Sequence, residues 1–196
     1  MKFLLALLLL LPVGGQDIMR EVILTAMSRN VWVETDSQQG SGVIISKNHV
    51  LTCFHALEVD SAIKVGVGEN AVKAKILKVD PEIDLCLLEV PTEDITDVVL
   101  AEDASINDKV FYVGNPKAHY NVFSPGRVVW LHGHNVYTNT LGMGGASGSG
   151  LYNTRGELVG ITQTMEGKEG EGYPLVTHIN FNVVRYFLKG TENGNQ

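Results

Sequence analysis

The sequence offers little material for a metal centre or a nucleic-acid surface. Its 196 residues include only two cysteines and six histidines, and no CxxC or HExxH spacing gathers them as zinc ligands. The 15 basic residues are outnumbered by 22 acidic ones, so the formal net charge is −7, whereas binding a nucleic-acid backbone requires lysine and arginine to neutralise phosphates. A phosphate-binding glycine pattern between a strand and a helix is also missing. We therefore expect no metal, no cofactor and no nucleic-acid partner.

Long hydrophobic runs are scarce as well. The apolar run at residues 3–11 is much shorter than the roughly 20 residues that span a bilayer. It follows the basic start Met1–Lys2 and precedes the small residues of 12–15, which is the pattern of a secretory signal peptide over residues 1–15. We therefore expect a secreted or periplasmic protein with no stable membrane insertion after signal cleavage. An uncleaved N-terminal anchor is the alternative.

Short strand-like runs dominate the rest of the chain. Aliphatic and β-branched segments, separated by turn residues, recur at roughly regular spacing, which indicates β-barrels or a sandwich. Residues 93–107 are more polar and acidic and are interpreted as a linker between two such series. We predict an all-β fold with two packed antiparallel β-barrels, at about residues 30–92 and 108–180. Short helices are predicted near the N-terminus, at 17–28, and near the C-terminus, at 182–189.

Glycine is concentrated in one place, around Ser147. Residues 142–150 hold five glycines, and a loop this dense in glycine needs an unusual backbone path that excludes a helix or a strand interior. A strand–turn–strand pattern follows it, so the serine lies on a tight loop that leads into a hairpin. A nucleophile needs such a mounting, with backbone N–H groups converging beside the hydroxyl. Because a Gly/Ser-rich run is more often a flexible loop, the catalytic interpretation needs a histidine and a carboxylate elsewhere.

Two further residues can supply these groups. His55 lies at the end of a predicted strand, and Asp84 opens another apolar strand. Each is ambiguous alone, because a single histidine is more often structural and an aspartate before a strand is often a cap or turn residue. A carboxylate that is to be buried against a histidine belongs, however, at the edge of such a run.

Together these segments resemble the trypsin-like (chymotrypsin-fold) serine endopeptidases, most closely the HtrA/Deg-type protease domain without PDZ domains. The resemblance covers roughly residues 30–188 and keeps the order histidine, aspartate, serine. The matching segments are the histidine segments 40–45 and 51–55, the aspartate segment 80–85, the opening of the second barrel at 113–116 and 124–129, the nucleophile loop 145–151 and the entry into the C-terminal helix at 179–184.

The resemblance implies a peptide hydrolase that works through an acyl-enzyme intermediate. Ser147 is then the nucleophile, His55 the general base and Asp84 the residue that orients the imidazole. The backbone N–H groups of Gly145 and Ser147 are implied to form the oxyanion hole.

The resemblance also implies where a polypeptide substrate binds. An extended peptide is expected to pair with the strand Thr162, Gln163 and Thr164. Leu141, Gly142 and Thr162 are implied to form the wall of the primary specificity pocket. Since this wall has no aspartate or histidine, we expect small to medium aliphatic side chains before the scissile bond.

Some features depart from the family pattern. Gly150 stands where cellular members usually have proline, and the compact stretch from Asp84 to Ser147 also resembles small viral chymotrypsin-like proteases. No PDZ domain is expected after the C-terminal helix, and no trypsin-style activation junction is present, so zymogen cleavage is not expected. An inactive peptide-binding homologue and a narrow-specificity viral-type processing protease therefore remain alternatives. Oligomeric state and natural substrate stay open.

The two cysteines flank the proposed catalytic residues. Cys53 lies two residues before His55, and Cys86 lies two residues after Asp84. Side chains two apart on a strand share a face, so the cysteines are expected to face each other if His55 and Asp84 touch. A disulfide is then permitted, but two buried free thiols are the favoured alternative.

Overall fold

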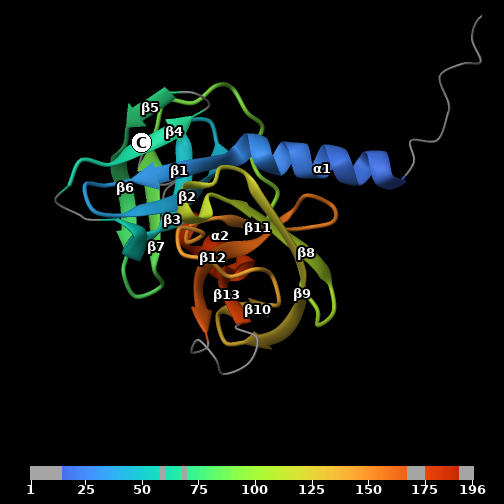
Figure 1. Cartoon of the computed structure of the whole chain (residues 1–196). Coiled ribbons are helices and arrows are strands. Elements are labelled where there is room, and N and C mark those ends of the chain that lie inside the picture. The colour runs from blue at the N-terminus through green and yellow to red at the C-terminus, as the bar shows by residue number, and fades with distance from the viewer. Residues whose placement is uncertain (1–14, 58–60, 68–69, 167–174, 190–196) are drawn as a thin grey trace, which may run out of the picture.

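Two β-sheet lobes lie side by side in the computed structural model (Figure 1). Helix α1 (Gly15–Arg29) leads into the first lobe, and its Ala26 is buried in the core cluster that residues of both lobes share. The structure describes residues 15–57, 61–67, 70–166 and 175–189. The predicted signal peptide, apart from Gly15, lies outside these residues. Neither of the described α-helices, α1 and α2 (Phe181–Lys189), is long and apolar enough to cross a membrane.

The first lobe is a seven-stranded antiparallel half-barrel in the order β5-β4-β1-β2-β3-β7-β6. Its middle strands are buried on both faces because one face covers the core of the lobe and the other packs against the second lobe. In β7, for example, Leu85 and Leu87 join the cluster between the lobes, whereas Cys86 and Leu88 join the cluster inside the first lobe. The strands are β1 (Asn30–Glu34), β2 (Gln39–Ser46), β3 (His49–Cys53), β4 (Lys64–Val67), β5 (Asn70–Lys73), β6 (Lys75–Asp80) and β7 (Leu85–Glu89).

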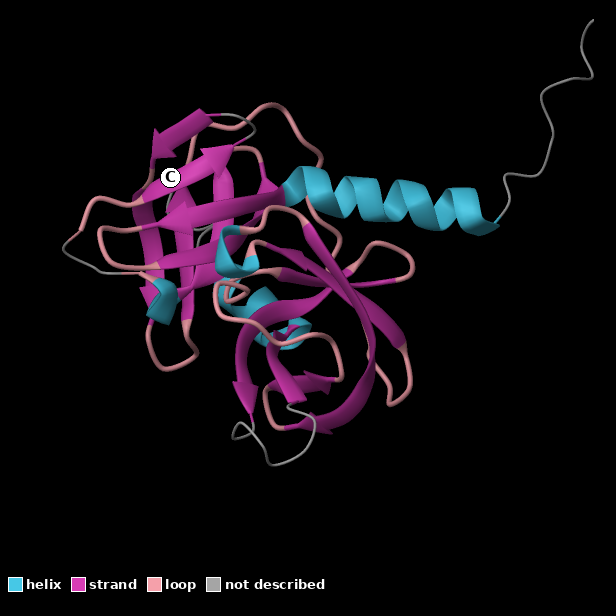
Figure 2. Cartoon of the chain, viewed as in Figure 1, coloured by secondary structure: helices cyan, strands magenta, loops and turns pink. Residues whose placement is uncertain are grey.

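The second lobe is a closed six-stranded barrel in the order β10-β13-β12-β11-β8-β9. Tyr112, Leu151 and Val159 lie in its apolar interior. Its strands are β8 (Lys109–Gly114), β9 (Val122–His132), β10 (Asn135–Thr138), β11 (Gly150–Asn153), β12 (Leu158–Glu166) and β13 (Leu175–Asn180). The predicted all-β class, with two packed β lobes and a short helix at each end, is confirmed (Figure 2).

The segment between the lobes is tied to both of them. The Val98 N–H donates to the Ile45 carbonyl of β2 at 2.7 Å, and Leu158 of β12 exchanges hydrogen bonds with the carbonyl of Val99 at 2.8 Å and the N–H of Ala101 at 3.0 Å. The segment therefore holds the lobes together by backbone contacts, which keeps residues from the two lobes at a fixed separation.

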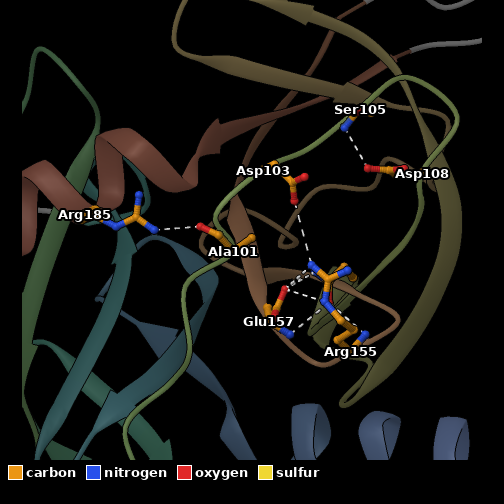
Figure 3. A network of polar contacts seen from close by, with 8 residues as sticks. Ala101, Asp103, Ser105, Asp108, Arg155, Glu157 and Arg185 are labelled. Atoms are coloured by element: carbon orange, nitrogen blue, oxygen red, sulfur yellow. Dashed lines mark hydrogen bonds and ion pairs between the residues drawn. The ribbon is translucent and has the colours of Figure 1, made fainter.

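Polar side chains hold the same segment on the second lobe (Figure 3). Arg185 of α2 donates to the Ala101 carbonyl at 2.8 Å. Arg155 lies 2.6 Å from the Glu157 carboxylate and 3.9 Å from that of Asp103. Because the Arg155 side chain is exposed, water screens its ion pair with Asp103, so the backbone contacts carry most of the attachment.

Candidate active site

The loop that carries Ser147 consists of two successive turns. The Ala146 N–H donates to the Met143 carbonyl at 3.1 Å, and the Ser149 N–H donates to the Ala146 carbonyl at 3.0 Å. The third residue of each turn is a glycine with positive φ, +90° at Gly145 and +89° at Gly148. This is the signature of type II turns, which favour glycine at that position. Two of the five glycines are therefore explained by backbone conformation.

The loop brings Ser147 to the histidine and aspartate of the other lobe. The Ser147 Oγ lies 3.0 Å from the His55 Nε2, and the His55 Nδ1 lies 2.7 Å from the Asp84 Oδ2. The other carboxylate oxygen of Asp84 accepts the backbone N–H of His55 at 2.9 Å. A continuous hydrogen-bonded chain of serine, imidazole and carboxylate thus crosses the junction between the lobes.

Short irregular segments next to strands aim these two side chains. His55 lies in the 3-10 turn η1 (Phe54–Ala56), directly after β3, and Asp84 directly precedes β7. Asp84 has a φ of +60°, in the left-handed region that non-glycine residues seldom adopt. A conformation of this kind costs about 1–3 kcal/mol and persists where the surroundings hold it. At Asp84 it turns the carboxylate toward His55, where a regular strand would not.

The ion pair sets the protonation of both partners. The hydrogen bond to Asp84 raises the pKa of His55, although partial burial of the imidazole opposes the shift. Burial by itself raises the pKa of Asp84, but the hydrogen bonds from the side chain and backbone of His55 outweigh it and leave that pKa below its ordinary value. Asp84 is therefore ionised at neutral pH, and His55 is held ready to accept a proton.

Gln163 contacts two of the three hydrogen-bonded residues, Asp84 and Ser147. Its side-chain Nε2 donates to the Asp84 Oδ2 at 3.0 Å, and its backbone carbonyl accepts the Ser147 hydroxyl at an O···O distance of 2.9 Å. It is the extra residue of a β-bulge, because Thr162 and Thr164 pair with the adjacent residues His178 and Thr177 of β13. Bulges commonly redirect a residue beside an active site. Sequence reasoning predicted Gln163 only as a substrate-binding strand residue and missed its contact with Asp84.

The two predicted oxyanion donors are available. In the described part of the chain, no hydrogen-bond acceptor lies against the backbone N–H of Gly145 or of Ser147. The neighbouring carbonyls are occupied: Gly144 O accepts the Lys117 N–H, and Gly145 O accepts the Ser41 hydroxyl. Both free N–H groups belong to the turns that present Ser147, so they suit a developing negative charge on a carbonyl oxygen bound there.

The predicted pocket wall contains a polar residue that sequence reasoning missed. Leu141 is 58% exposed and Gly142 follows it in the loop, whereas Thr162 is buried with its Oγ1 3.1 Å from the Nδ1 of His178. The Nε2 of His178 lies 2.8 Å from the Thr138 Oγ1. Burial lowers the pKa of His178 to about 3, so this histidine is neutral. A histidine within the apolar strand 175–179 was the available signal.

Cys53 and Cys86 are both buried free thiols, and the predicted face-to-face arrangement is wrong. In the β3–β7 ladder Cys53 pairs with Leu85, whereas Cys86 pairs with Thr52, so the two thiols lie on opposite faces of the sheet. The rule of alternation fails because the left-handed Asp84 interrupts the strand before Cys86. Burial raises the pKa of both thiols, that of Cys86 to about 12, and the Asp84 charge adds to the effect at Cys53.

Three potential metal ligands, Cys53, His55 and Asp84, have ligand atoms within 4.8 Å of one another. Each is already engaged: the Cys53 thiol lies 3.2 Å from the Thr162 carbonyl, and the imidazole and carboxylate bind each other. These hydrogen bonds account for the cluster, and we assign it no metal.

Two packed β lobes with a serine, a histidine and an aspartate linked between them are the architecture of trypsin-like peptidases. Comparison with protein families matches residues 40–161 to the trypsin-like peptidase domain. This match covers more than half of the chain, and the chain belongs to that family.

The chain is similar to HtrA-type proteases. It is 29% identical over 169 residues to the serine protease Do-like HtrA of Lactococcus lactis subsp. lactis (strain IL1403), covering 74% of this chain and 41% of that protein. It is 30% identical over 161 residues to the periplasmic serine endoprotease DegP of Salmonella typhimurium, covering 74% and 34%. For the serine endoprotease DegS of Haemophilus influenzae the identity is 28% over 171 residues, covering 76% and 50%. The match therefore spans half or less of these relatives.

Solved structures share the fold. The serine endoprotease from Yersinia pestis superposes with a TM-score of 0.79 at 24% identity, covering 90% of this chain and 67% of that one. Rv3671c from Mycobacterium tuberculosis H37Rv, solved in an inactive form, gives a TM-score of 0.76 at 19% identity, covering 89% and 92%.

Proposed function

We propose that this chain is a serine endopeptidase in which Ser147 attacks the peptide carbonyl, His55 is the general base and Asp84 orients His55. The observation that carries the proposal is the hydrogen-bonded chain of the three side chains, with contacts of 3.0 Å and 2.7 Å. Membership of the trypsin-like peptidase family supports it.

The proposed chemistry follows from the hydrogen bonds. Donation of the His55 Nδ1–H to Asp84 leaves Nε2 as an acceptor for the Ser147 hydroxyl proton. As Oγ bonds to the carbonyl carbon, the proton moves to Nε2 and the negative charge on the carbonyl oxygen meets the N–H groups of Gly145 and Ser147. The protonated imidazole then gives its proton to the leaving amine, and water releases the acyl group by the same steps.

A bound peptide is proposed to extend the sheet at Gln163 and Thr164. The third residue of the predicted strand, Thr162, has its backbone N–H on Ser149 and its carbonyl on Gly148, so it is not available for pairing. The Ser147 hydroxyl has a single hydrogen, which it can direct to the Gln163 carbonyl or to His55 but not to both. A substrate N–H that takes the Gln163 carbonyl would direct this hydrogen to His55. Binding and activation of the nucleophile would then be coupled.

The expected preference for small to medium aliphatic side chains before the scissile bond stays a prediction. The neutral imidazole of His178 behind Thr162 supplies no charge that would favour acidic or basic side chains.

The signal-peptide pattern of residues 1–15 supports export, and the DegP relative is a periplasmic protein by name. We therefore propose a secreted or periplasmic location. Release of the chain into the medium or periplasm with a new N-terminus near Gly15 would support this, and retention of the intact Met1 end on the membrane would contradict it.

Cleavage of a peptide library by the wild-type chain and by Ser147→Ala tests the activity. We expect wild type to cut internal peptide bonds and the variant, which keeps the fold but lacks the nucleophile, to cut none. A folded wild-type protein that binds library peptides without cutting them would establish the alternative, an inactive peptide-binding module. One narrow cleavage sequence would instead indicate a processing protease of the viral type.

A further inference from the structure

The first glycine turn is held from outside the nucleophile loop. Gly144 O accepts a hydrogen bond from the Lys117 N–H at 2.9 Å, and Gly145 O accepts one from the Ser41 Oγ at 2.8 Å. Lys117 lies in the 3-10 turn η2 (Pro116–Ala118) after β8, and Ser41 lies in β2 of the other lobe. Two successive carbonyls of one turn are thus fixed by two unrelated segments.

Ser41 has little freedom to do anything else. Its side chain is fully buried, and its Oγ accepts the Asn115 N–H at 2.8 Å, which leaves its own hydrogen for the Gly145 carbonyl. Its N–H donates to the Ser147 carbonyl at 2.8 Å, and its carbonyl accepts the Thr52 hydroxyl at 2.7 Å. Every polar group of Ser41 is therefore used, and two of them are used on the nucleophile loop.

The orientation of the Gly144–Gly145 peptide decides whether the Gly145 N–H points toward the proposed oxyanion hole. Type I and type II turns differ by rotation of this central peptide, and the φ of +90° at Gly145 places the turn in the type II form. The carbonyl and N–H of a trans peptide point in opposite directions. Holding the Gly144 carbonyl on Lys117 therefore holds the Gly145 N–H on the other side, where no described residue accepts it.

The turn that supplies the Lys117 N–H is itself strained. Lys117 has φ 49° and ψ 39°, and Ala118 has φ 60°, so two adjacent non-glycine residues adopt the left-handed conformation. Such strain persists where the surroundings impose it and gathers at functional sites. A Cβ on Gly145 would lie 3.0 Å from the Lys117 nitrogen, which shows how closely the two segments are packed.

We propose that Ser41 is a positioning residue for the oxyanion hole. The Lys117 N–H holds the Gly144–Gly145 peptide with the Gly145 N–H toward the substrate carbonyl. Ser41 holds the next peptide, Gly145–Ala146, through the Gly145 carbonyl, so that Gly145 keeps the positive φ that this orientation needs; we call this arrangement the peptide lock. The inference rests on the proposed function and adds to it a residue that touches neither substrate nor the reacting atoms. It also makes the first lobe responsible for the shape of a loop in the second.

Kinetics of Ser41→Ala test the lock. Thr52→Val is the matched control, because it deletes the buried hydrogen bond from the Thr52 hydroxyl to the Ser41 carbonyl and leaves the Ser41 hydroxyl in place. We expect Ser41→Ala to lose about 10- to 100-fold in kcat, somewhat less than the roughly 10²- to 10³-fold for removal of an oxyanion donor. KM should stay within about threefold, because ground-state contacts are intact. The pH profile should not move, since His55 and Asp84 are untouched.

An inhibitor pair makes the readout specific. A peptide aldehyde, whose hemiacetal oxygen occupies the oxyanion hole, should lose affinity for Ser41→Ala by a factor similar to the loss in kcat, and the corresponding peptide alcohol should not. Unchanged kcat in Ser41→Ala, or an equal loss in Thr52→Val, overturns the proposal. Ser41→Cys, which keeps the shape with a much weaker donor, gives the same comparison if the alanine variant does not fold.

Crystal structures of the wild type and of Ser41→Ala provide a readout that needs no activity. The lock predicts that in the variant the Gly144 carbonyl leaves the Lys117 N–H and the peptide rotates in part or all of the molecules. An unrotated peptide overturns the proposal even in an active enzyme. If the wild type is inactive but the Gly144–Gly145 peptide rotates in Ser41→Ala, the proposed protease function is refuted and the peptide lock is supported.

Discussion

The two lobes prepare their shares of the site by different means. The half-barrel contributes His55 and Asp84 from segments beside strands, and hydrogen bonds to the Asp84 carboxylate hold them in place. The closed barrel contributes Ser147 and two free N–H groups from glycine turns, and their arrangement depends on backbone conformation. Loss of a polar side-chain atom should therefore disturb the His55–Asp84 pair of the first lobe most. Addition of a Cβ should disturb the glycine turns of the second lobe most.

Asp84→Asn should have the largest effect and tests the first half of this comparison. The amide no longer holds His55 in the tautomer with Nε2 free, so we expect kcat to fall by about 10⁴-fold while the fold is kept. Asp80→Asn is the control, because within the described residues the Asp80 carboxylate accepts the N–H groups of Glu82 and Ile83 and touches no member of the catalytic chain. Steady-state kinetics on a peptide substrate measure both, and near-normal turnover in Asp84→Asn would remove Asp84 from the catalytic chain.

Gly148→Ala tests the second half. A Cβ at this position, with φ +89°, would lie 1.9 Å from the Ser41 carbonyl oxygen, so we expect the free energy of unfolding to fall by about 3 kcal/mol or more. Gly144→Ala is the matched control, because a Cβ there meets no atom within 4 Å and should cost less than about 1 kcal/mol. Urea denaturation of both variants checks this, and equal losses would contradict the argument from backbone conformation.

His178 gives the second lobe an acid sensitivity of its own. The folded state keeps this imidazole neutral, with a pKa of about 3, whereas the unfolded state takes up a proton below its ordinary value of 6.5. Its contribution is therefore present above pH 6.5 and is lost as the pH falls from there, by about 1.4 kcal/mol per unit. At pH 5 we expect a loss of about 2 kcal/mol in unfolding free energy.

His178→Gln, which has no titrating group, should remove that slope. The check is urea denaturation of wild type and variant between pH 7 and 5. Parallel pH dependence in the two proteins would show that another group causes the acid sensitivity.

The smallest effect is a pH shift that belongs to the first lobe. Because the hydrogen bond to Asp84 raises the pKa of His55 above 6.5, kcat/KM should decline on the acid side with a midpoint above 6.5. The contribution of His55 to folding stability has the opposite pH dependence to the activity. It is fully present below pH 6.5 and is lost as the pH rises through the pKa of His55 in the folded state. A kinetic midpoint at or below 6.5 would contradict the proposed role of the His55–Asp84 pair.

The sequence was sufficient to predict the parts of the site that depend on local pattern. The glycine turns around Ser147 and the positions of His55 and Asp84 beside strands follow from residues that are neighbours in the chain. Their convergence followed only from the resemblance to a family, since nothing local brings residues of two lobes together.

The remaining parts depend on register and on contacts over long distances. The left-handed Asp84 upset the prediction for Cys86, and the bulge at Gln163 gave that residue a contact that no alternation pattern predicts. His178 and Ser41 are buried polar residues whose partners come from other strands or the other lobe. No spacing within the sequence relates them to the site.

The central claim is that one hydroxyl is activated across the junction between the lobes. Labelling with a fluorophosphonate probe, followed by peptide mapping in a mass spectrometer, tests it most directly. We predict one adduct, on Ser147, that is absent from Ser147→Ala and strongly slowed in His55→Ala and Asp84→Asn. A folded wild-type protein that stays unlabelled, or an adduct on another residue, would contradict the account.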